Sequence, residues 1–339
     1  MLIGVCGLGN TGSFAVIDLL REYSELEYSP LLHEFSFCYC PDGIADLEYH
    51  LVKAPARFQS SDLAFYRFQK VLKDFFNPQI YKDKKLYAQI VGMCENYLQS
   101  ITQVSWQGTW GARIRDYSAF KKLVYKVLFK TRSIFGEKFF LDFTNEEMRY
   151  SNNPENFLEI TKEFIDSLLR TIVEDYPDKK GLIIDQMLPG DNPEPFIRYY
   201  KDPYAIVVDR DPRDLYILSK YEIHSDSTWI PTDDVESFIA YYRNMRKKNY
   251  NNQQILRIQY EDLIYEYERT IKVLEDFLGV SDHKNPKRFF VPEVSINNTQ
   301  LFIKHKECAE DVKKIETELK DWLYDYSKYP VMKSFGKTW

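Results

Sequence analysis

Apolar residues along the chain follow two different spacings. Short, nearly continuous apolar runs occur at 2–6, 181–185, 204–208 and 255–258. Runs of this length are typical of central strands in a parallel sheet, because both faces of such a sheet are covered. Between these runs, apolar residues recur every three or four positions, which predicts amphipathic helices. Strands that alternate with helices predict an α/β fold with a doubly wound parallel sheet.

The pattern also locates further elements. A helix is predicted to begin at Ser13, directly after the glycine-rich turn that ends the first run. We predict a second strand at Phe35–Cys40, stopped by the Pro-Asp-Gly that follows it. Two more helices are predicted near 158–169 and at 267–278, the latter closed by Gly279 as its C-cap.

The middle of the chain has a different pattern. From about residue 45 to residue 151, strand-like runs disappear and helical spacing dominates, including one apolar stripe formed by Phe120, Leu123, Val124, Val127 and Leu128. We interpret 45–151 as a helical insertion into a single α/β domain that spans 1–339. The basic run Arg113–Lys138 is interpreted as a solvated helix face or as a docking surface for an anionic substrate.

Composition excludes several classes of protein. Hydrophobic residues make up 44% of the chain and charged residues 28%, which allows a sizeable core. The net charge of -6 argues against nucleic acid as a partner, because phosphate-rich polymers need a basic footprint. Five cysteines without a Cys-x-x-Cys spacing predict neither a disulfide framework nor a metal site. Aromatic residues make up 16% of the chain; we interpret most of them as core residues and a few as candidates to line a sugar or base pocket.

Two further features concern location. No stretch approaches the roughly 20 apolar residues that cross a bilayer. The first residues, MLIGVCGLGN, lack the basic and apolar regions of a secretory signal. We therefore expect a cytoplasmic protein with no membrane span.

The segment 7–13, Gly-Leu-Gly-Asn-Thr-Gly-Ser, joins the first strand to the first helix. Backbone N–H groups and the helix dipole converge on such a loop, so phosphate binding is predicted, with a tight turn without ligand as the alternative. The loop satisfies the Gly-x-Gly-x-x-Gly of dinucleotide-binding folds, but Asp42 follows a proline and is a poor match for the acidic residue expected there. It also resembles a P-loop in which Ser13-Phe14 replaces the Lys-Ser/Thr.

A second candidate anion site follows the run 204–208. That run continues as Asp-Arg-Asp-Pro-Arg-Asp from residue 209, and Arg210 then lies at the carboxyl end of a parallel strand, where α/β folds bind ligands. A guanidinium binds phosphate bidentately. Pro212 suits the start of a helix, which Asp214 is predicted to cap. A surface ion-pair cluster is the alternative.

These residues carry a family resemblance. Arg210-Asp211-Pro212-Arg213-Asp214 resembles the 3′-phosphate-binding motif of sulfotransferases that use 3′-phosphoadenosine-5′-phosphosulfate (PAPS). Residues 260–263, Tyr-Glu-Asp-Leu, and 277–279, Phe-Leu-Gly, are similar to two later segments of that family. Residues 291–298 are similar to its cofactor-covering tail. The resemblance extends over residues 2–280 except for the helical insertion.

The resemblance implies a P-loop-NTPase-like topology and transfer of a sulfuryl group from PAPS, as co-substrate, to a hydroxyl acceptor. We expect the acceptor to be a carbohydrate, either a glycan or a glycan precursor. Two separated pockets would hold the two anionic ends of one nucleotide at the same sheet edge, with catalysis by alignment and charge stabilisation. The implied donor-binding residues are Gly9, Asn10, Thr11, Gly12, Ser13, Phe14, Arg210, Ser219, Asn298 and Lys304.

The sequence departs from the family pattern at two of these positions. Asn10 stands where the family carries a Lys or Arg that neutralises the departing phosphate, and Arg113 or Arg115 is a candidate replacement. Leu218 occupies the position of the family's serine, so Ser219 is the nearest hydroxyl. A catalytically inactive nucleotide-binding protein, a P-loop kinase-like protein and a nicotinamide-dependent oxidoreductase therefore stay open as alternatives.

The catalytic base is assigned by position. Family members use His or Glu near the end of the strand before the arginine motif, and in this chain that strand ends at Asp185. A carboxylate at a strand end can be partly desolvated and so made more basic, which makes Asp185 the candidate base. A turn-capping role is the alternative for Asp185, and His224 is the reserve candidate.

Overall fold

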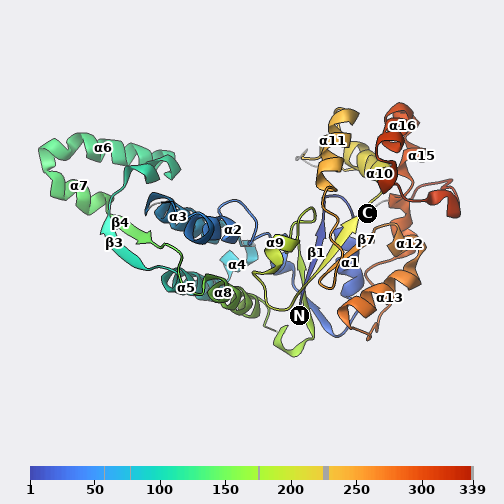
Figure 1. The fold of residues 1–339 in the computed structure, drawn as a ribbon, viewed down its shortest axis with the longest axis horizontal. Helices are drawn as coiled ribbons and strands as arrows, with labels where there is room; N and C mark the ends of the chain where they lie inside the picture. Colours follow the sequence, from blue (N-terminus) through green and yellow to red (C-terminus); the bar gives the residue numbers. More distant parts are fainter. Residues whose placement is uncertain (57, 77, 175, 224–228, 337–339) are drawn as a thin grey trace. The chain divides into compact units, whose positions relative to one another are not determined.

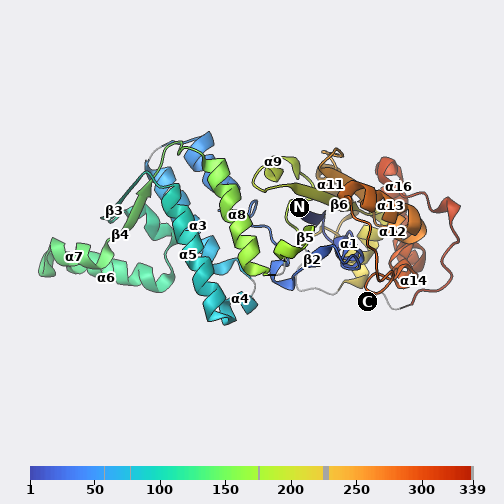
Figure 2. The same cartoon turned by 90° about the horizontal axis from the view of Figure 1, so that it is seen from below.

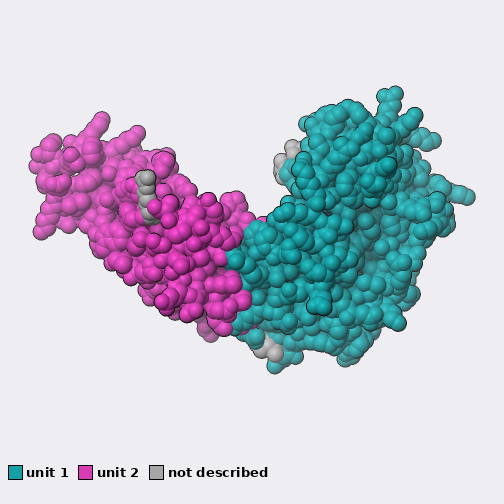
Figure 3. Space-filling view, in the orientation of Figure 1, with its two compact units in different colours: residues 1–38, 169–339 teal, residues 39–168 magenta. Residues whose placement is uncertain are grey.

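The computed structural model describes residues 1–56, 58–76, 78–174, 176–223 and 229–336. The chain divides into two compact units (Figure 3). Unit 1 comprises residues 1–38 and 169–339, and unit 2 comprises residues 39–168. In the sequence, unit 2 is therefore inserted between two parts of unit 1.

Unit 1 is built on a five-stranded parallel sheet with the order β2-β5-β1-β6-β7 (Figure 1). The strands are β1 Leu2–Gly7, β2 Leu26–Tyr28, β5 Gly181–Asp185, β6 Pro203–Asp209 and β7 Ile255–Gln259. Side chains along β1, β5 and β6 are almost all buried, as their continuous apolar runs predict. The prediction of an α/β fold with a parallel sheet flanked by helices is confirmed.

The register of the sheet brings three strand ends together. β1 lies between β5 and β6, with Val5 opposite Asp185 and Gly7 opposite Val208. Because all three strands are parallel, their carboxyl ends lie at the same edge of the sheet. The segments that follow β1, β5 and β6 therefore start as neighbours.

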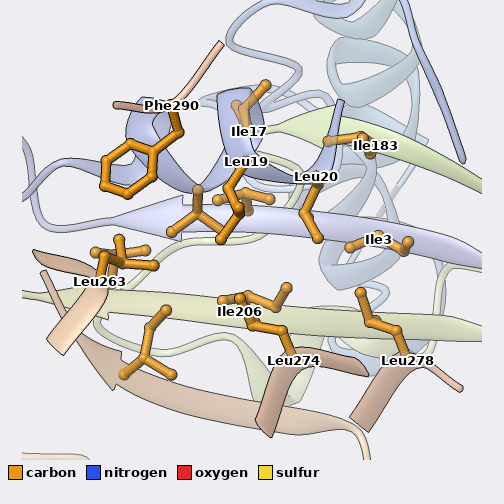
Figure 4. Close-up of a cluster of buried hydrophobic side chains, with 14 of the residues drawn as sticks. Ile3, Ile17, Leu19, Leu20, Ile183, Ile206, Leu263, Leu274, Leu278 and Phe290 are labelled. Atoms are coloured by element: carbon orange, nitrogen blue, oxygen red, sulfur yellow. The ribbon is translucent and has the colours of Figure 1, made fainter. Parts of the chain in front are cut away.

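Helices cover this sheet with apolar side chains. Ile17 and Leu20 of α1 and Leu274 of α13 pack with Ile3 and Ile206 of the strands in one buried cluster (Figure 4). Burial of each such side chain contributes about 1.5–3 kcal/mol. The helices of unit 1 are α1 Ser13–Leu20, α9 Glu194–Ile197, α10 Pro212–Ile217, α11 Val235–Met245, α12 Asp262–Tyr265, α13 Tyr267–Leu278, α14 Pro292–Ser295, α15 Leu301–Lys304 and α16 Ala309–Glu318.

Unit 2 is mostly helical. α5 Lys84–Ser100 and α8 Phe157–Ile172 lie side by side (Figure 2). Between them, the rings of Tyr97 and Phe164 stack with centroids 4.3 Å apart. α6 and α7 follow one another as a helical hairpin. The helices are α2 Ile44–Glu48, α3 Phe58–Asp74, α4 Pro78–Lys82, α5 Lys84–Ser100, α6 Ala119–Phe135, α7 Glu137–Thr144 and α8 Phe157–Ile172, the last of which ends in unit 1.

Two strand predictions are wrong. The stretch predicted to lack strands contains the antiparallel pair β3 Val104–Gly108 and β4 Glu146–Tyr150. All side chains of β3 except the last are exposed, so this strand has no apolar run to reveal it. The predicted strand Phe35–Cys40 forms turns, and the second strand is the three-residue β2. The apolar pattern at Phe37 and Cys38 reflects their burial in the core and does not indicate a strand.

The other predicted elements are confirmed, including α1, α8 and α13, and Gly279 ends α13 with a φ of 65°. All five cysteines are free thiols. Within the described ranges, no helix combines the length and the apolar character that crossing a bilayer requires.

Candidate functional site

One cavity of about 370 Å³ lies at the carboxyl edge of the sheet in unit 1. The glycine loop after β1 and Arg210 after β6 both line it, and Asn298 joins them. This volume lies within the range of small-molecule sites, about 300–1,000 Å³. The resemblance predicts two separated pockets, one at the loop and one at Arg210. In the structure both line the same cavity. Arg210 Nη1 donates a hydrogen bond of 2.9 Å to the carbonyl oxygen of Asn10, so the two lie in direct contact.

The loop has an unusual backbone. Gly9, Asn10 and Gly12 all have positive φ, at 79°, 52° and 91°. At Gly12, a Cβ atom would also lie 2.3 Å from Cδ2 of Tyr260, so glycine is required both by conformation and by space. Thr11 is buried, and its hydroxyl accepts the N–H of Leu8 at 3.3 Å, so it stabilises the loop from inside.

The loop leads directly into the first turn of α1. Gly12 is the N-cap of this helix and offers no side chain to it, and the first turn contains no acidic residue. The positive end of the helix dipole is therefore not compensated by a side chain of the helix itself. Ser13 and Phe14 of this turn line the cavity.

Arg210 is the most buried cation of the cavity, with 2% of its surface exposed. Its Nη2 donates to the carbonyl oxygen of Asn298, and its guanidinium lies 4.8 Å from the ring centre of Tyr260. It forms no ion pair with a carboxylate of the described residues, and its Nε has no hydrogen-bond partner among them. A buried guanidinium without a carboxylate in direct contact is costly, so an anion in this cavity would be stabilised by Arg210.

Arg213 lies three residues away and has a different environment. Its Nε and Nη2 bind the carboxylate of Asp211 at 3.0 and 2.7 Å, and its Nη1 binds Glu316 at 2.9 Å. Asp211 also caps α10 by accepting the N–H of Arg213 at 2.8 Å, with Pro212 in the first turn. The predicted capping role of Asp214 is therefore wrong, and Arg213 is a structural residue.

Asp214 fixes the late segment of the chain. Its buried carboxylate accepts the backbone N–H groups of Gln300 at 2.9 Å and Leu301 at 2.6 Å. These bonds hold the segment that presents the Asn298 carbonyl to Arg210. Glu261 accepts the N–H of Asp211 at 3.0 Å. Burial, reinforced by the charge of Asp211, raises the pKa of Asp214 to about 6 and that of Glu261 to about 8.

Asp185 lies at the end of β5 and pairs with a residue that sequence analysis missed. Its Oδ2 lies 2.7 Å from Nδ1 of His33 and accepts the N–H of Glu34 at 3.1 Å. Burial raises the pKa of Asp185, although these two contacts oppose the increase. The His33 side chain is 52% exposed, and its ring lies 6.1 Å from that of Phe14, which lines the cavity. His33 belongs to no motif, so no local signal marks it.

Two further predicted donor-binding residues have different positions. Ser219 Oγ accepts a hydrogen bond of 3.2 Å from Nδ2 of Asn10, so Ser219 lies beside the loop. Lys304 forms an ion pair with Glu222 and is not among the residues that line the cavity. His224 lies outside the described residues.

The candidate replacements for the loop lysine belong to unit 2. Arg113 is buried there, with Nε 2.8 Å from Asp62 and Nη1 3.2 Å from Glu146, so its charge is already compensated. Arg115 is exposed.

Comparisons with known proteins add no assignment. No protein-family model matches the chain, and no curated protein matches it. In the part of the chain that the structure describes, no group of three or more His, Cys, Asp or Glu side chains is arranged to hold a metal ion.

Proposed function

We propose that unit 1 binds PAPS and transfers its sulfuryl group to a hydroxyl, which we expect to belong to a carbohydrate. The observation that carries this proposal is the environment of Arg210. This guanidinium is buried without a carboxylate partner among the described residues, and it borders a cavity lined by a glycine loop and by the first turn of α1. Both features favour an anionic ligand.

The topology supports a P-loop-like arrangement. Numbered in chain order within the sheet, the strand order β2-β5-β1-β6-β7 is 2-3-1-4-5. This differs from the 3-2-1-4-5-6 order of dinucleotide-binding folds and from the 2-1-3-4-5 order of flavodoxin-like folds. The order therefore argues against a nicotinamide-dependent oxidoreductase. Asp42, the acidic residue considered for ribose binding, lies in unit 2.

Arg210 can also supply the positive charge that Asn10 lacks. The resemblance implied that Arg210 binds the 3′-phosphate, at a distance from the loop. Because Arg210 donates to the backbone of Asn10 itself, its charge is available to the phosphosulfate end of the donor as well. Asn10 then contributes polar contacts, and Arg210 contributes the charge that stabilises the departing phosphate.

His33 is the proposed base, and Asp185 is a positioning residue. The contact with Asp185 engages Nδ1 and leaves Nε2 to accept the proton of the acceptor hydroxyl. The hydroxyl oxygen attacks sulfur, the bond between sulfur and the bridging phosphate oxygen breaks, and 3′-phosphoadenosine-5′-phosphate (PAP) leaves with that electron pair. Asp185 fixes the tautomer and orientation of the imidazole, as a carboxylate does in a Ser-His-Asp triad.

Titration calorimetry and thermal unfolding with PAP, ATP and NAD test the binding. We expect PAP to stabilise the fold, by about 2.7 kcal/mol at a concentration of 100 Kd. Arg210→Ala should weaken PAP binding at least ~100-fold, because charge-assisted hydrogen bonds to phosphate contribute about 1.5–3 kcal/mol each. Arg269→Ala, an exposed arginine outside the cavity, is the matched control. Stabilisation by NAD alone, or unchanged binding in Arg210→Ala, would refute the proposal.

Turnover needs a separate measurement. Transfer of labelled sulfate from PAPS to a panel of glycans tests it, and His33→Ala should abolish transfer while PAP still binds. The uncharged Asn10 favours one second candidate, an inactive nucleotide-binding protein. That candidate predicts PAP binding without transfer to any acceptor.

A further inference from the structure

The hairpin formed by α6 and α7 in unit 2 exposes an apolar face. No residue of α6 is buried, and Phe120 and Ile134 are 76% and 75% exposed. The hairpin surface consists of Phe120, Leu123, Val124, Val127, Ile134 and Phe135 of α6 with Phe139 and Phe143 of α7. The α6 members recur at spacings of three and four residues, apart from the turn occupied by Thr131, so they share one face of the helix.

This surface is unusual for the molecule. Of the twenty large hydrophobic side chains that are exposed within the described ranges, ten lie between residues 120 and 143. A second, smaller apolar side of α6 contacts α7, because Tyr125 and Phe129 pack edge-on against Phe140. Concentrated apolar exposure of this kind marks an interaction surface rather than ordinary surface composition.

The charge around the hairpin surface identifies the partner. Residues 118–144 contain six Lys or Arg and two Asp or Glu, a net charge of +4 in a chain whose net charge is -6. α6 itself has five of these cations and no acidic residue. Lys126 and Lys130 flank the apolar stripe on one side. Lys121 and Arg132 flank it on the other side, and these two residues are eleven positions, or about three helical turns, apart.

Most of this charge is not neutralised within the protein. Lys121 pairs with Glu146, but Lys126 and Lys130 form no ion pair with any residue that the structure describes. An apolar stripe bordered on both sides by exposed lysines matches an anionic lipid surface. The stripe enters the acyl boundary, while the lysine stems extend outward and place their ammonium groups at the phosphates.

We propose that the hairpin surface docks unit 2 onto anionic membranes, with α6 lying in the plane of the interface. Seventeen residues of helix span only about 25 Å, and cations occur along its whole length, so α6 lies on a bilayer and does not cross it. A second copy is a poorer partner, because two such faces would bring like charges together. The proposal does not depend on nucleotide binding by unit 1.

Co-sedimentation of the full chain with vesicles tests this docking. Vesicles of phosphatidylcholine with phosphatidylserine should bind the protein in a salt-dependent manner, and vesicles of phosphatidylcholine alone should bind it far less. Lys126→Glu with Lys130→Glu should lower the affinity for anionic vesicles at least roughly 30-fold. Lys306→Glu with Lys313→Glu, two exposed lysines of unit 1, makes the same change in net charge and should retain binding.

A second variant tests the apolar contribution. Leu123→Ser with Val127→Ser should also weaken vesicle binding, and the fold should persist because neither side chain is buried, as circular dichroism would verify. Arg210→Ala should bind vesicles normally. The proposal is overturned if anionic vesicles do not bind the protein, or if the unit 1 control loses as much affinity as the α6 charge variant. It is also overturned if the serine variant binds unchanged, or if that variant dissolves a dimer seen by sedimentation velocity.

Discussion

The cavity of unit 1 and the hairpin surface of unit 2 both combine cations with aromatic rings, but they differ in burial. Arg210 is almost fully enclosed and fixed by two backbone carbonyls and the ring of Tyr260. Lys126 and Lys130 are exposed on long side chains. A fixed, desolvated cation suits one discrete anion, whereas exposed cations beside an apolar stripe suit an extended anionic surface.

This comparison shows that a basic run in a sequence can contain residues with opposite roles. In the sequence, Arg113–Lys138 forms a single basic run. Arg113 proves to be a buried partner of Asp62, whereas the lysines of α6 are exposed. Only the burial of each side chain separates the two roles.

The largest expected effect concerns Arg213. Arg213→Ala should lower the free energy of unfolding by about 3–5 kcal/mol, because it leaves the carboxylate of Asp211 buried without its partner. Arg132→Ala on α6 should change it by no more than about 0.5 kcal/mol. Urea unfolding followed by tryptophan fluorescence measures both. If the two variants lost equal stability, burial would not distinguish the two regions.

The next effect is a pH dependence centred on Glu261. Burial raises its pKa from 4.5 to about 8, so the folded protein holds a proton that the unfolded chain releases between those values. The free energy of unfolding should therefore fall as pH rises from about 5 to 8, by on the order of 2 kcal/mol. Glu261→Gln, which keeps an acceptor for the N–H of Asp211, should flatten this slope.

Glu146 in unit 2 should give a pH dependence of the free energy of unfolding with the opposite sign. Although burial alone raises its pKa, Lys121 and Arg113 outweigh that effect and hold the pKa below its usual value. Its contribution to stability is present above the ordinary pKa of a glutamate and is lost as pH falls through the lowered folded value. Glu146→Gln should thus reduce stability near neutral pH. Slopes of the same sign from the two carboxylates in urea titrations would contradict this assignment.

The last predicted effect distinguishes two glycines, Gly12 and Gly92. Gly12→Ala should cost about 2 kcal/mol, because φ is 91° and the new methyl group would meet Tyr260. Gly92→Ala in α5 should instead stabilise the protein by about 0.5–1 kcal/mol, since no atom outside the adjoining residues and the backbone of α5 lies within 4 Å of the added carbon. Thermal unfolding of the two variants gives the comparison, and destabilisation by Gly92→Ala would show that α5 is constrained in another way.

Sequence alone predicted the parts of the fold that have a strong local pattern. β1, β5, β6 and β7 are apolar runs, so their positions were predictable, and the loop after β1 and Arg210 followed from them. β2 has only three residues, and β3 is exposed, so neither carries a usable apolar pattern.

Long-range pairings in the site were not predictable in this way. His33 and Asp185 are separated by about 150 residues, and Asp214 and Gln300 by 86. Neither pair has a spacing rule, because only the completed sheet and the fixed late segment bring the partners together. Asn298 was identified through family resemblance and not from its own chemistry.

The insertion of unit 2 also has a consequence for biosynthesis. β1 is a central strand, yet both of its neighbours, β5 and β6, are encoded more than 170 residues later. At a translation rate of 5–20 residues per second, β5 is synthesised roughly 9–35 seconds after β1, because unit 2 is made in between. During that interval the apolar segment of β1, LIGVC, is available to chaperones, and a slower ribosome would prolong this vulnerable period.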